Sequence, residues 1–212
     1  MRKYIVLLLA GLIVSCRPAQ KDAALPFYNT PDFTPLWLTP TDEGYKSIHT
    51  IAPFSFTNQL GQAISNKNVA GKIYVANFFF TSCGSICPQM MSNLARVQDV
   101  FGNDDRVRIL SHSVTPLHDN VPVLLKYANE RHINNKNWWL LTGDHDAIYK
   151  LARQSYFAED ENGFKKGTAD FLHTENLVLI DKHGRIRGVY NGSLQLEVDN
   201  LIKHIKLLEQ ES

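Results

Sequence analysis

The stretch that decides the fold is Ile73-Tyr-Val-Ala-Asn-Phe-Phe-Phe80-Thr-Ser-Cys83-Gly-Ser-Ile-Cys87-Pro88. Its first eight residues are apolar on both faces apart from Asn77, which is typical of a strand covered on both sides. The apolar residues that follow recur at helical spacing, at Met90, Met91, Leu94, Val97 and Phe101. The sequence therefore predicts a buried strand that passes through two cysteines into a helix.

Regular patterns on both sides of this stretch predict one domain over residues 51–212. A hairpin is expected around Asn58-Gln-Leu-Gly61. Further elements are expected as strands over 107–110 and 138–141, helices over 121–132 and 144–156, a hairpin over 176–190 and a helix over 194–208. This order predicts an α/β, thioredoxin-like fold with a mixed central sheet, an N-terminal β-hairpin and helices on both faces.

The first 16 residues read as a targeting segment. Arg2 and Lys3 precede an 11-residue apolar run, which is too short to span a bilayer and fits the core of a signal peptide. The run ends in Ile13-Val-Ser-Cys16, which resembles the bacterial lipobox. We expect residues 1–15 to be removed and Cys16 to carry lipid, so that the protein is a membrane-anchored lipoprotein on the periplasmic side. The alternative is an ordinary signal peptide with an incidental cysteine.

Residues 16–50 are expected to form an extended tether. Five of the nine prolines lie in this segment, spread among polar residues with no sustained period. Proline interrupts both helices and strand ladders, which favours a spacer between the anchor and the domain.

Composition excludes several classes of protein. The 212 residues are 44% apolar and 20% charged, which are ordinary globular values. The chain has 22 lysines and arginines against 21 acidic residues, a net charge of +1. It therefore lacks the excess of positive charge that is typical of nucleic-acid-binding proteins. Three cysteines are too few for a disulfide scaffold.

The remaining thiols, Cys83 and Cys87, sit where the buried strand turns into the helix. Backbone N–H groups and the helix dipole favour a thiolate there, and a thiolate is both nucleophile and metal ligand. If both lie in the first helical turn, their spacing places the two sulfurs on one face. They could chelate one ion or form a disulfide. A structural disulfide would close almost no loop, and a four-thiolate zinc site would need a second cysteine pair.

Among eight histidines, His173 is the leading candidate for a third ligand. His183 in a hairpin turn and His204 on the last helix are expected to be bystanders, whereas His112 and His118 follow the strand over 107–110 and stay secondary candidates. His173 immediately precedes the strand near Asn176, in a loop that faces the cysteine helix in thioredoxin-like folds. No proline follows Pro122, so the usual cis-proline of that loop is absent. Two thiolates and one imidazole suit copper in either oxidation state.

Four motifs in this order resemble the Sco/SenC family of thioredoxin-fold copper proteins over about residues 50–208. They are Phe80-Thr-Ser-Cys-Gly-Ser-Ile-Cys-Pro88, Ser113-Val-Thr-Pro116 with Val121-Pro-Val-Leu-Leu-Lys-Tyr127, Trp139-Leu-Leu-Thr-Gly143, and Phe171-Leu-His-Thr174. The resemblance implies copper ligands at Cys83, Cys87 and His173. It also implies that copper is delivered to, or thiols are reduced at, the dinuclear copper site of cytochrome c oxidase subunit II.

The chain departs from this family at several positions. The family commonly has Pro-Asp where this chain has Gly84-Ser85, an acidic residue where it has Thr115, and often Asp where it has Leu172. One extra residue lies near Val121. These differences remove negative charge near the site and leave the ligand set intact.

Three functions remain open on the sequence. The first is a copper-binding assembly factor, whose partners are the oxidase subunit or another copper acceptor and a thiol-reducing protein. The second is an extracytoplasmic thiol–disulfide oxidoreductase, in which Cys83 attacks a partner disulfide and Cys87 resolves the mixed disulfide. The third is a binding module in which the cysteine pair only rigidifies a loop.

Overall fold

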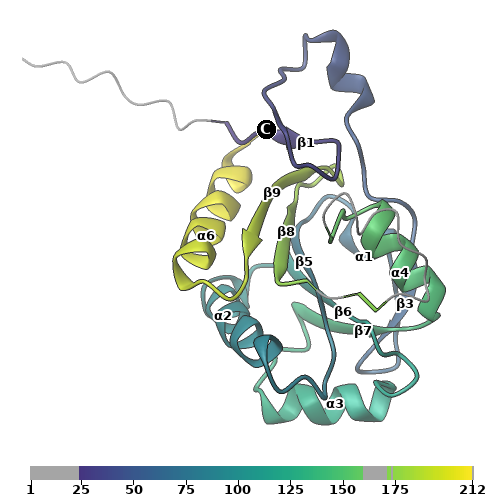
Figure 1. Cartoon of the computed structure of the whole chain (residues 1–212). Helices are drawn as coiled ribbons and strands as arrows, with labels where there is room; N and C mark the ends of the chain where they lie inside the picture. The colour runs from purple at the N-terminus through teal and green to yellow at the C-terminus, as the bar shows by residue number, and fades with distance from the viewer. Residues whose placement is uncertain (1–23, 160–170, 173, 212) are drawn as a thin grey trace, which may run out of the picture.

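The fold is built around one seven-stranded sheet (Figure 1). The structure is a computed structural model that describes residues 24–159, 171, 172 and 174–211, so Cys16 and His173 lie outside the described residues. The strands are β3 (Ser55–Asn58), β4 (Ala63–Ser65), β5 (Ile73–Phe79), β6 (Val107–Ser113), β7 (Trp138–Thr142), β8 (Asn176–Ile180) and β9 (Ile186–Asn191). Their order across the sheet is β4-β3-β7-β6-β5-β8-β9.

The sheet is mixed, and its parallel centre is made by β5, β6 and β7. β6 pairs in parallel with both β5 and β7, whereas β3, β4, β8 and β9 join by antiparallel pairing. Parallel strands end at the same edge of a sheet, so the loops after Phe79 and Ser113 leave the sheet side by side. The α/β thioredoxin-like fold with a mixed sheet and an N-terminal hairpin is confirmed.

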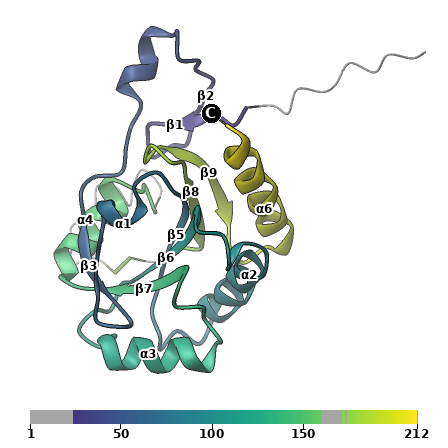
Figure 2. The same ribbon diagram turned by 180° about the vertical axis from the view of Figure 1, so that it is seen from behind.

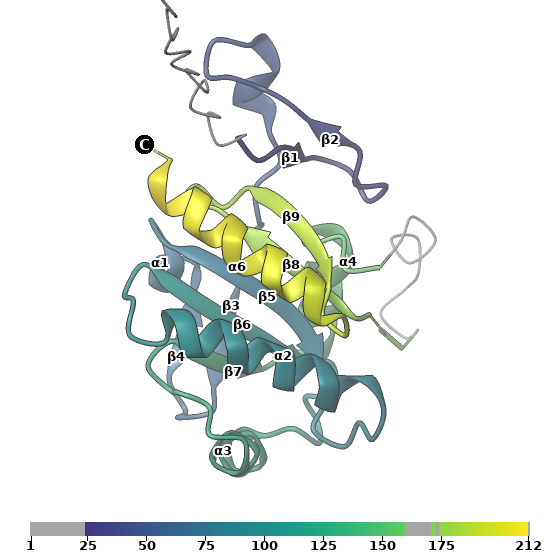
Figure 3. The same ribbon diagram turned by 90° about the vertical axis from the view of Figure 1, so that its left-hand side faces the viewer.

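Helices cover both faces of this sheet (Figures 2 and 3). Side chains alternate along β5, so that Val75 and Phe79 enter one core cluster while Ala76 and Phe78 enter the other. The first cluster lies under α2 (Ile86–Phe101), α3 (Val121–Glu130) and α6 (Gln195–Gln210). The second lies under the short α1 (Asn66–Val69) and α4 (His145–Gln154).

Asn77, the polar residue of β5, is part of a buried chain of hydrogen bonds. The Ser111 hydroxyl donates to the Asn77 amide oxygen at 2.6 Å, and the Trp138 indole N–H donates to the Ser111 hydroxyl at 2.8 Å. These bonds satisfy polar groups on three neighbouring strands that would otherwise be buried without partners.

The N-terminal segment differs from the expected extended tether, because its described part is folded. Residues 24–50 contain β1 (Phe27–Tyr28) paired with β2 (Pro35–Leu36), and the 3-10 helix η1 (Glu43–Ser47). Leu25, Phe27 and Ile48 are buried, and β1 contacts β9. Apolar side chains among the prolines therefore pack on the domain and hold this segment there.

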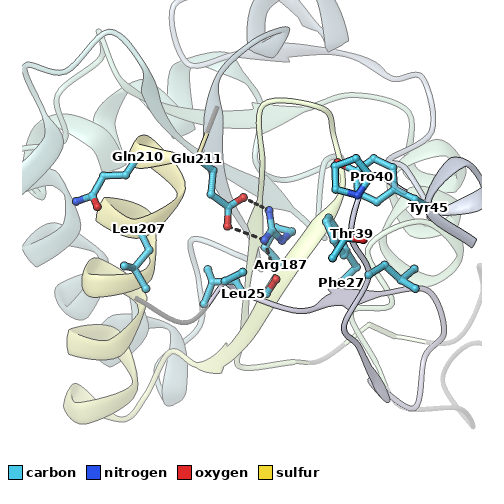
Figure 4. Close-up of a pocket in the computed structure, with 11 residues that line it drawn as sticks. Leu25, Phe27, Thr39, Pro40, Tyr45, Arg187, Leu207, Gln210 and Glu211 are labelled. Atoms are coloured by element: carbon cyan, nitrogen blue, oxygen red, sulfur yellow. Dashed lines mark hydrogen bonds and ion pairs between the residues drawn. The ribbon is translucent and has the colours of Figure 1, made fainter. Parts of the chain in front are cut away.

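An arginine ties this segment to the C-terminal end of the chain (Figure 4). The buried Arg187 side chain of β9 donates from Nη2 to the Leu25 carbonyl at 2.7 Å and from Nε to the Pro26 carbonyl at 3.1 Å. It also forms a bidentate ion pair with Glu211, at 2.5 and 2.8 Å. A cleft of about 490 Å³ lies between these two segments. No helix among residues 24–159 and 174–211 is long and apolar enough to cross a membrane.

Candidate functional site

The two thiols lie at the carboxyl edge of β5, where the strand gives way to α2. Cys83 is half-buried in the connecting loop, and Cys87 is buried as the second residue of α2. The Cys83 N–H donates to the Phe80 carbonyl at 3.3 Å, which bends the loop back toward the helix. Because α2 begins at Ile86, Cys83 precedes the helix instead of lying in its first turn, yet its thiol and that of Cys87 are close enough to shift each other's pKa.

This contact makes the two sulfurs chemically unequal. Burial is the largest influence on Cys83 and raises its pKa, but hydrogen bonds from the Cys87 thiol and from the N–H groups of residues 85–87 outweigh it and lower the pKa. Burial, and after it donation to Cys83, raises the pKa of Cys87 to about 12. Cys83 is thus the more acidic and more exposed sulfur, whereas Cys87 retains its proton.

A buried carboxylate that the sequence analysis did not single out ties the thiol loop to its neighbour. Asp119 is completely buried in the loop between β6 and α3. It accepts hydrogen bonds from the Thr81 N–H and hydroxyl at 3.0 and 2.5 Å, from the Ser113 hydroxyl at 2.6 Å and from the Thr115 hydroxyl at 3.1 Å. Burial raises the Asp119 pKa, but these bonds and one to His118 lower it overall. The only sequence signal was an acidic residue in a loop rich in serine and threonine.

His112 does not lie in a loop, because β6 continues to Ser113 beyond the predicted end at residue 110. Its ring is completely buried among Phe54, Phe56, Phe78 and Tyr156, with centroids 5.2–6.2 Å away. These aromatic residues belong to the cluster under α1 and α4, whereas Cys87 belongs to the cluster on the opposite face of the sheet. The structure therefore does not bring His112 to the thiols.

Among the described residues, His118, His183 and His204 form no cluster of three metal-ligand side chains with the thiols. His118 is exposed, and its Nδ1 lies 2.9 Å from an Asp119 oxygen. His183 is exposed in the turn after β8. His204 on α6 is paired with the Tyr190 hydroxyl at 2.7 Å.

The residues that flank His173 lie near the thiol loop. The Phe171 ring packs edge-to-face against Phe80 with centroids 5.5 Å apart, and Leu172 is buried. Within the described residues, no three histidine, cysteine or acidic side chains gather as a metal site. The expected copper set has only its two sulfur members among these residues, and adjacent thiols are soft donors of the kind copper prefers.

Comparisons with known proteins agree with this geometry. A family model described as SCO1/SenC matches residues 42–208. A SCO1/SenC family lipoprotein from Bacillus anthracis is 29% identical, with a TM-score of 0.66 over 76% of this chain and 96% of that chain. Arabidopsis thaliana ScoI, solved with copper bound, is 26% identical, with a TM-score of 0.57 over 74% and 98% of the two chains.

A third structure is that of BsSco, a member of the Sco family of cytochrome c oxidase assembly proteins in which a disulfide switch was identified. It is 28% identical, with a TM-score of 0.65 over 78% of this chain and 96% of that chain. The family match covers well over half of the sequence, including both cysteines. The chain belongs to the SCO1/SenC family.

Proposed function

We propose that this protein binds copper through Cys83, Cys87 and His173 and delivers it to, or maintains the thiols of, the dinuclear copper site of cytochrome c oxidase. The observation that carries the proposal is the pair of free, neighbouring thiols where β5 gives way to α2. The copper-bound Arabidopsis relative and the oxidase-assembly description of BsSco support both cargo and destination.

The position of Phe171 supports His173 as the third ligand. Phe171 contacts Phe80, and Phe80 accepts the hydrogen bond from the Cys83 N–H. His173 follows Phe171 by two residues, a separation that a chain can span in about 7 Å. Two thiolates and one imidazole would leave an open side on Cu(I), where a thiolate of the acceptor could attack. Copper would then pass by stepwise ligand exchange.

We further propose that Cys16 carries a lipid that anchors the protein outside the cytoplasm, on the periplasmic side. The apolar run before Cys16 and the Bacillus anthracis relative described as a lipoprotein support this location. Acyl chains would hold the protein at the membrane without a basic patch. A mass shift of the mature N-terminal peptide in wild type, absent from Cys16→Ala, tests the anchor.

The copper proposal is tested by anaerobic Cu(I) titration of the reduced mature chain carrying Cys16→Ser. We expect one tightly bound copper, no specific binding by the Cys83→Ser, Cys87→Ser double variant, and much weaker binding by His173→Ala. His183→Ala is the matched control, because that histidine is exposed in a turn. Equal copper uptake by the double variant would contradict the proposal.

The second candidate is a thiol–disulfide oxidoreductase, and the unequal thiols favour it. An acidic, accessible Cys83 beside a protonated Cys87 is the arrangement of an attacking and a resolving thiol. His173→Ala separates the two functions, because it removes a copper ligand and leaves both thiols. Oxidase assembly that survives this substitution in cells would favour thiol exchange over copper delivery.

A further inference from the structure

Three other segments meet the thiol loop at the carboxyl edge of the sheet. The loop after β6 is held to it by Asp119 and Thr81, and Phe171 packs on Phe80. The turn between β9 and α6 lies on the first turns of α2, where the Gln89 side chain donates to the Ser193 carbonyl at 2.8 Å. These contacts make one continuous surface around Cys83.

This surface carries almost no charge. Residues 80–95, 113–119, 171–172, 174–175 and 188–196 contain two residues that are Asp, Glu, Lys or Arg, which are Asp119 and Glu175. Glu175 is half-buried and accepts a hydrogen bond from the Asn191 side chain at 3.0 Å. Asp119 is completely buried, and its carboxylate accepts hydrogen bonds from Thr81, Ser113 and Thr115. Residues 160–170 lie outside the described residues and do not enter this argument. A fifth of the whole chain is charged, so the low content of charged residues at this edge is a local feature.

The same surface is unusually apolar. The exposed side chains are Leu117 at 95%, Leu196 at 69%, Leu194 at 54% and Phe171 at 50%. Only three other large apolar side chains are exposed among the described residues, and they are scattered over the residue after β2, α2 and the β3–β4 turn. We call Leu117, Phe171, Leu194 and Leu196 the thiol face. Exposed apolar side chains on segments that meet around one reactive group favour an interaction site there.

We propose that the thiol face docks a partner protein whose own surface around its cysteines is neutral and apolar. Continuity with Cys83 identifies the partner as one that brings a thiol or disulfide to that sulfur. A charged partner residue buried against this face would lose its water without gaining a counter-ion, which costs affinity. That the partner bears a thiol or disulfide rests on the proposed function. The new inference is that its contact surface is neutral and apolar.

The test uses three symmetric peptide disulfides of one length, whose cysteine is flanked by leucines, glutamates or lysines. The Cys83 thiolate attacks one peptide sulfur, so that a mixed disulfide forms and one peptide thiol leaves. Cys87 then loses its proton and displaces the second peptide, so two electrons pass from the cysteine pair to the peptides. The reduced protein carrying Cys16→Ser is mixed with each peptide disulfide, and the release of peptide thiol is followed over time. Each rate is divided by the rate at which the same protein reduces 2,2′-dithiodipyridine, a small neutral disulfide.

We expect the leucine peptide to react about threefold or more faster than both charged peptides, which is the size of a surface charge effect. Its rate should be the same in about 20 mM and about 500 mM salt, because screening acts only on charge. Leu117→Glu should favour the lysine peptide and Leu117→Lys the glutamate peptide. Leu60→Glu is the matched control, because Leu60 lies in the β3–β4 turn beside Gln59, which bonds to Asn135 at the opposite edge of the sheet.

Equal rates for the three peptides, or a preference of wild type for either charged peptide, would overturn the proposal. So would identical shifts from Leu60→Glu and Leu117→Glu. Copper titration is independent of these rates. A protein that binds no copper but ranks the peptides as expected would refute the proposed function alone, and the converse result would refute the docking proposal alone.

Discussion

The Asp119 carboxylate accepts two hydrogen bonds from Thr81, one from its backbone N–H at 3.0 Å and one from its hydroxyl at 2.5 Å. Thr81 stands two residues before Cys83, and Asp119 belongs to the loop after the neighbouring strand. The pair therefore fixes the start of the thiol loop to a separate element. A buried carboxylate with this many donors is a strong local constraint, because removing it leaves several buried donors without a partner.

Asp119→Ala should lower the free energy of unfolding by about 3 kcal/mol, because the donors of Thr81, Ser113 and Thr115 lose a charged acceptor. It should also speed the alkylation of buried Cys87 by loosening the thiol loop. Urea denaturation and mass spectrometry of iodoacetamide adducts measure the two effects. Thr81→Ser is the control, because it keeps both donors to Asp119. An unchanged urea midpoint in Asp119→Ala would refute the constraint.

Cys83 should be alkylated before Cys87 in the reduced protein. The pKa of Cys83 lies below its ordinary value and that of Cys87 is raised to about 12, so at any given pH Cys83 has the larger fraction of thiolate. Cys87→Ala removes a hydrogen bond to the Cys83 thiolate and should slow its alkylation about threefold. Cys87→Ser, which keeps a donor, should slow it less. The pH dependence of iodoacetamide labelling checks this order, and equal labelling of both thiols in wild type would contradict it.

The sequence predicted the sheet and its helices well where one pattern dominates. The run from Ile73 to Phe80 is too apolar for anything but a covered strand, and α2 follows with a regular apolar face. The end of β6 was missed because Ser111, His112 and Ser113 are polar in a strand that is buried on both faces. The Ser111 side chain, for example, is buried with partners from two other strands, Asn77 and Trp138, which local pattern cannot reveal.

The same distinction between local pattern and contacts across the fold applies to the site. Cys83 and Cys87 are close in sequence, and their spacing at a strand–helix junction is enough to bring them together. Asp119 reaches the thiol loop only through the pairing of β5 with β6, so its role is a property of the fold. The tether was misjudged because prolines dominate its composition, whereas Leu25, Phe27 and Ile48 decide its packing.

His112 should make the protein sensitive to acid. Burial lowers its pKa to about 3, and within the described residues neither ring nitrogen has a hydrogen-bond partner. The unfolded chain takes up a proton near pH 6.5 and the folded chain does not, so stability is highest above pH 6.5 and falls as pH drops toward 3. Between pH 6.5 and 4.5 this group alone should cost about 2 kcal/mol.

His112→Leu should remove that part of the pH dependence, because leucine cannot take up a proton in the unfolded chain. Urea midpoints at about pH 7 and about pH 4.5 should therefore lie closer together in His112→Leu than in wild type. His183→Leu is the control, because the exposed ring at residue 183 is open to solvent. A wild-type pH dependence that persists in His112→Leu would assign the acid sensitivity to other groups.

Arg187→Met should release the N-terminal segment from the domain. The Arg187 guanidinium bonds to the carbonyls of Leu25 and Pro26 and to Glu211, and methionine can replace its volume but none of these bonds. Hydrogen exchange over residues 24–36 should accelerate about tenfold or more, while exchange in β5 and β6 stays slow. Glu211→Gln keeps the arginine and its two carbonyl contacts, so it should accelerate exchange less. Unchanged exchange in Arg187→Met would mean that Leu25 and Phe27 hold the segment by apolar packing alone.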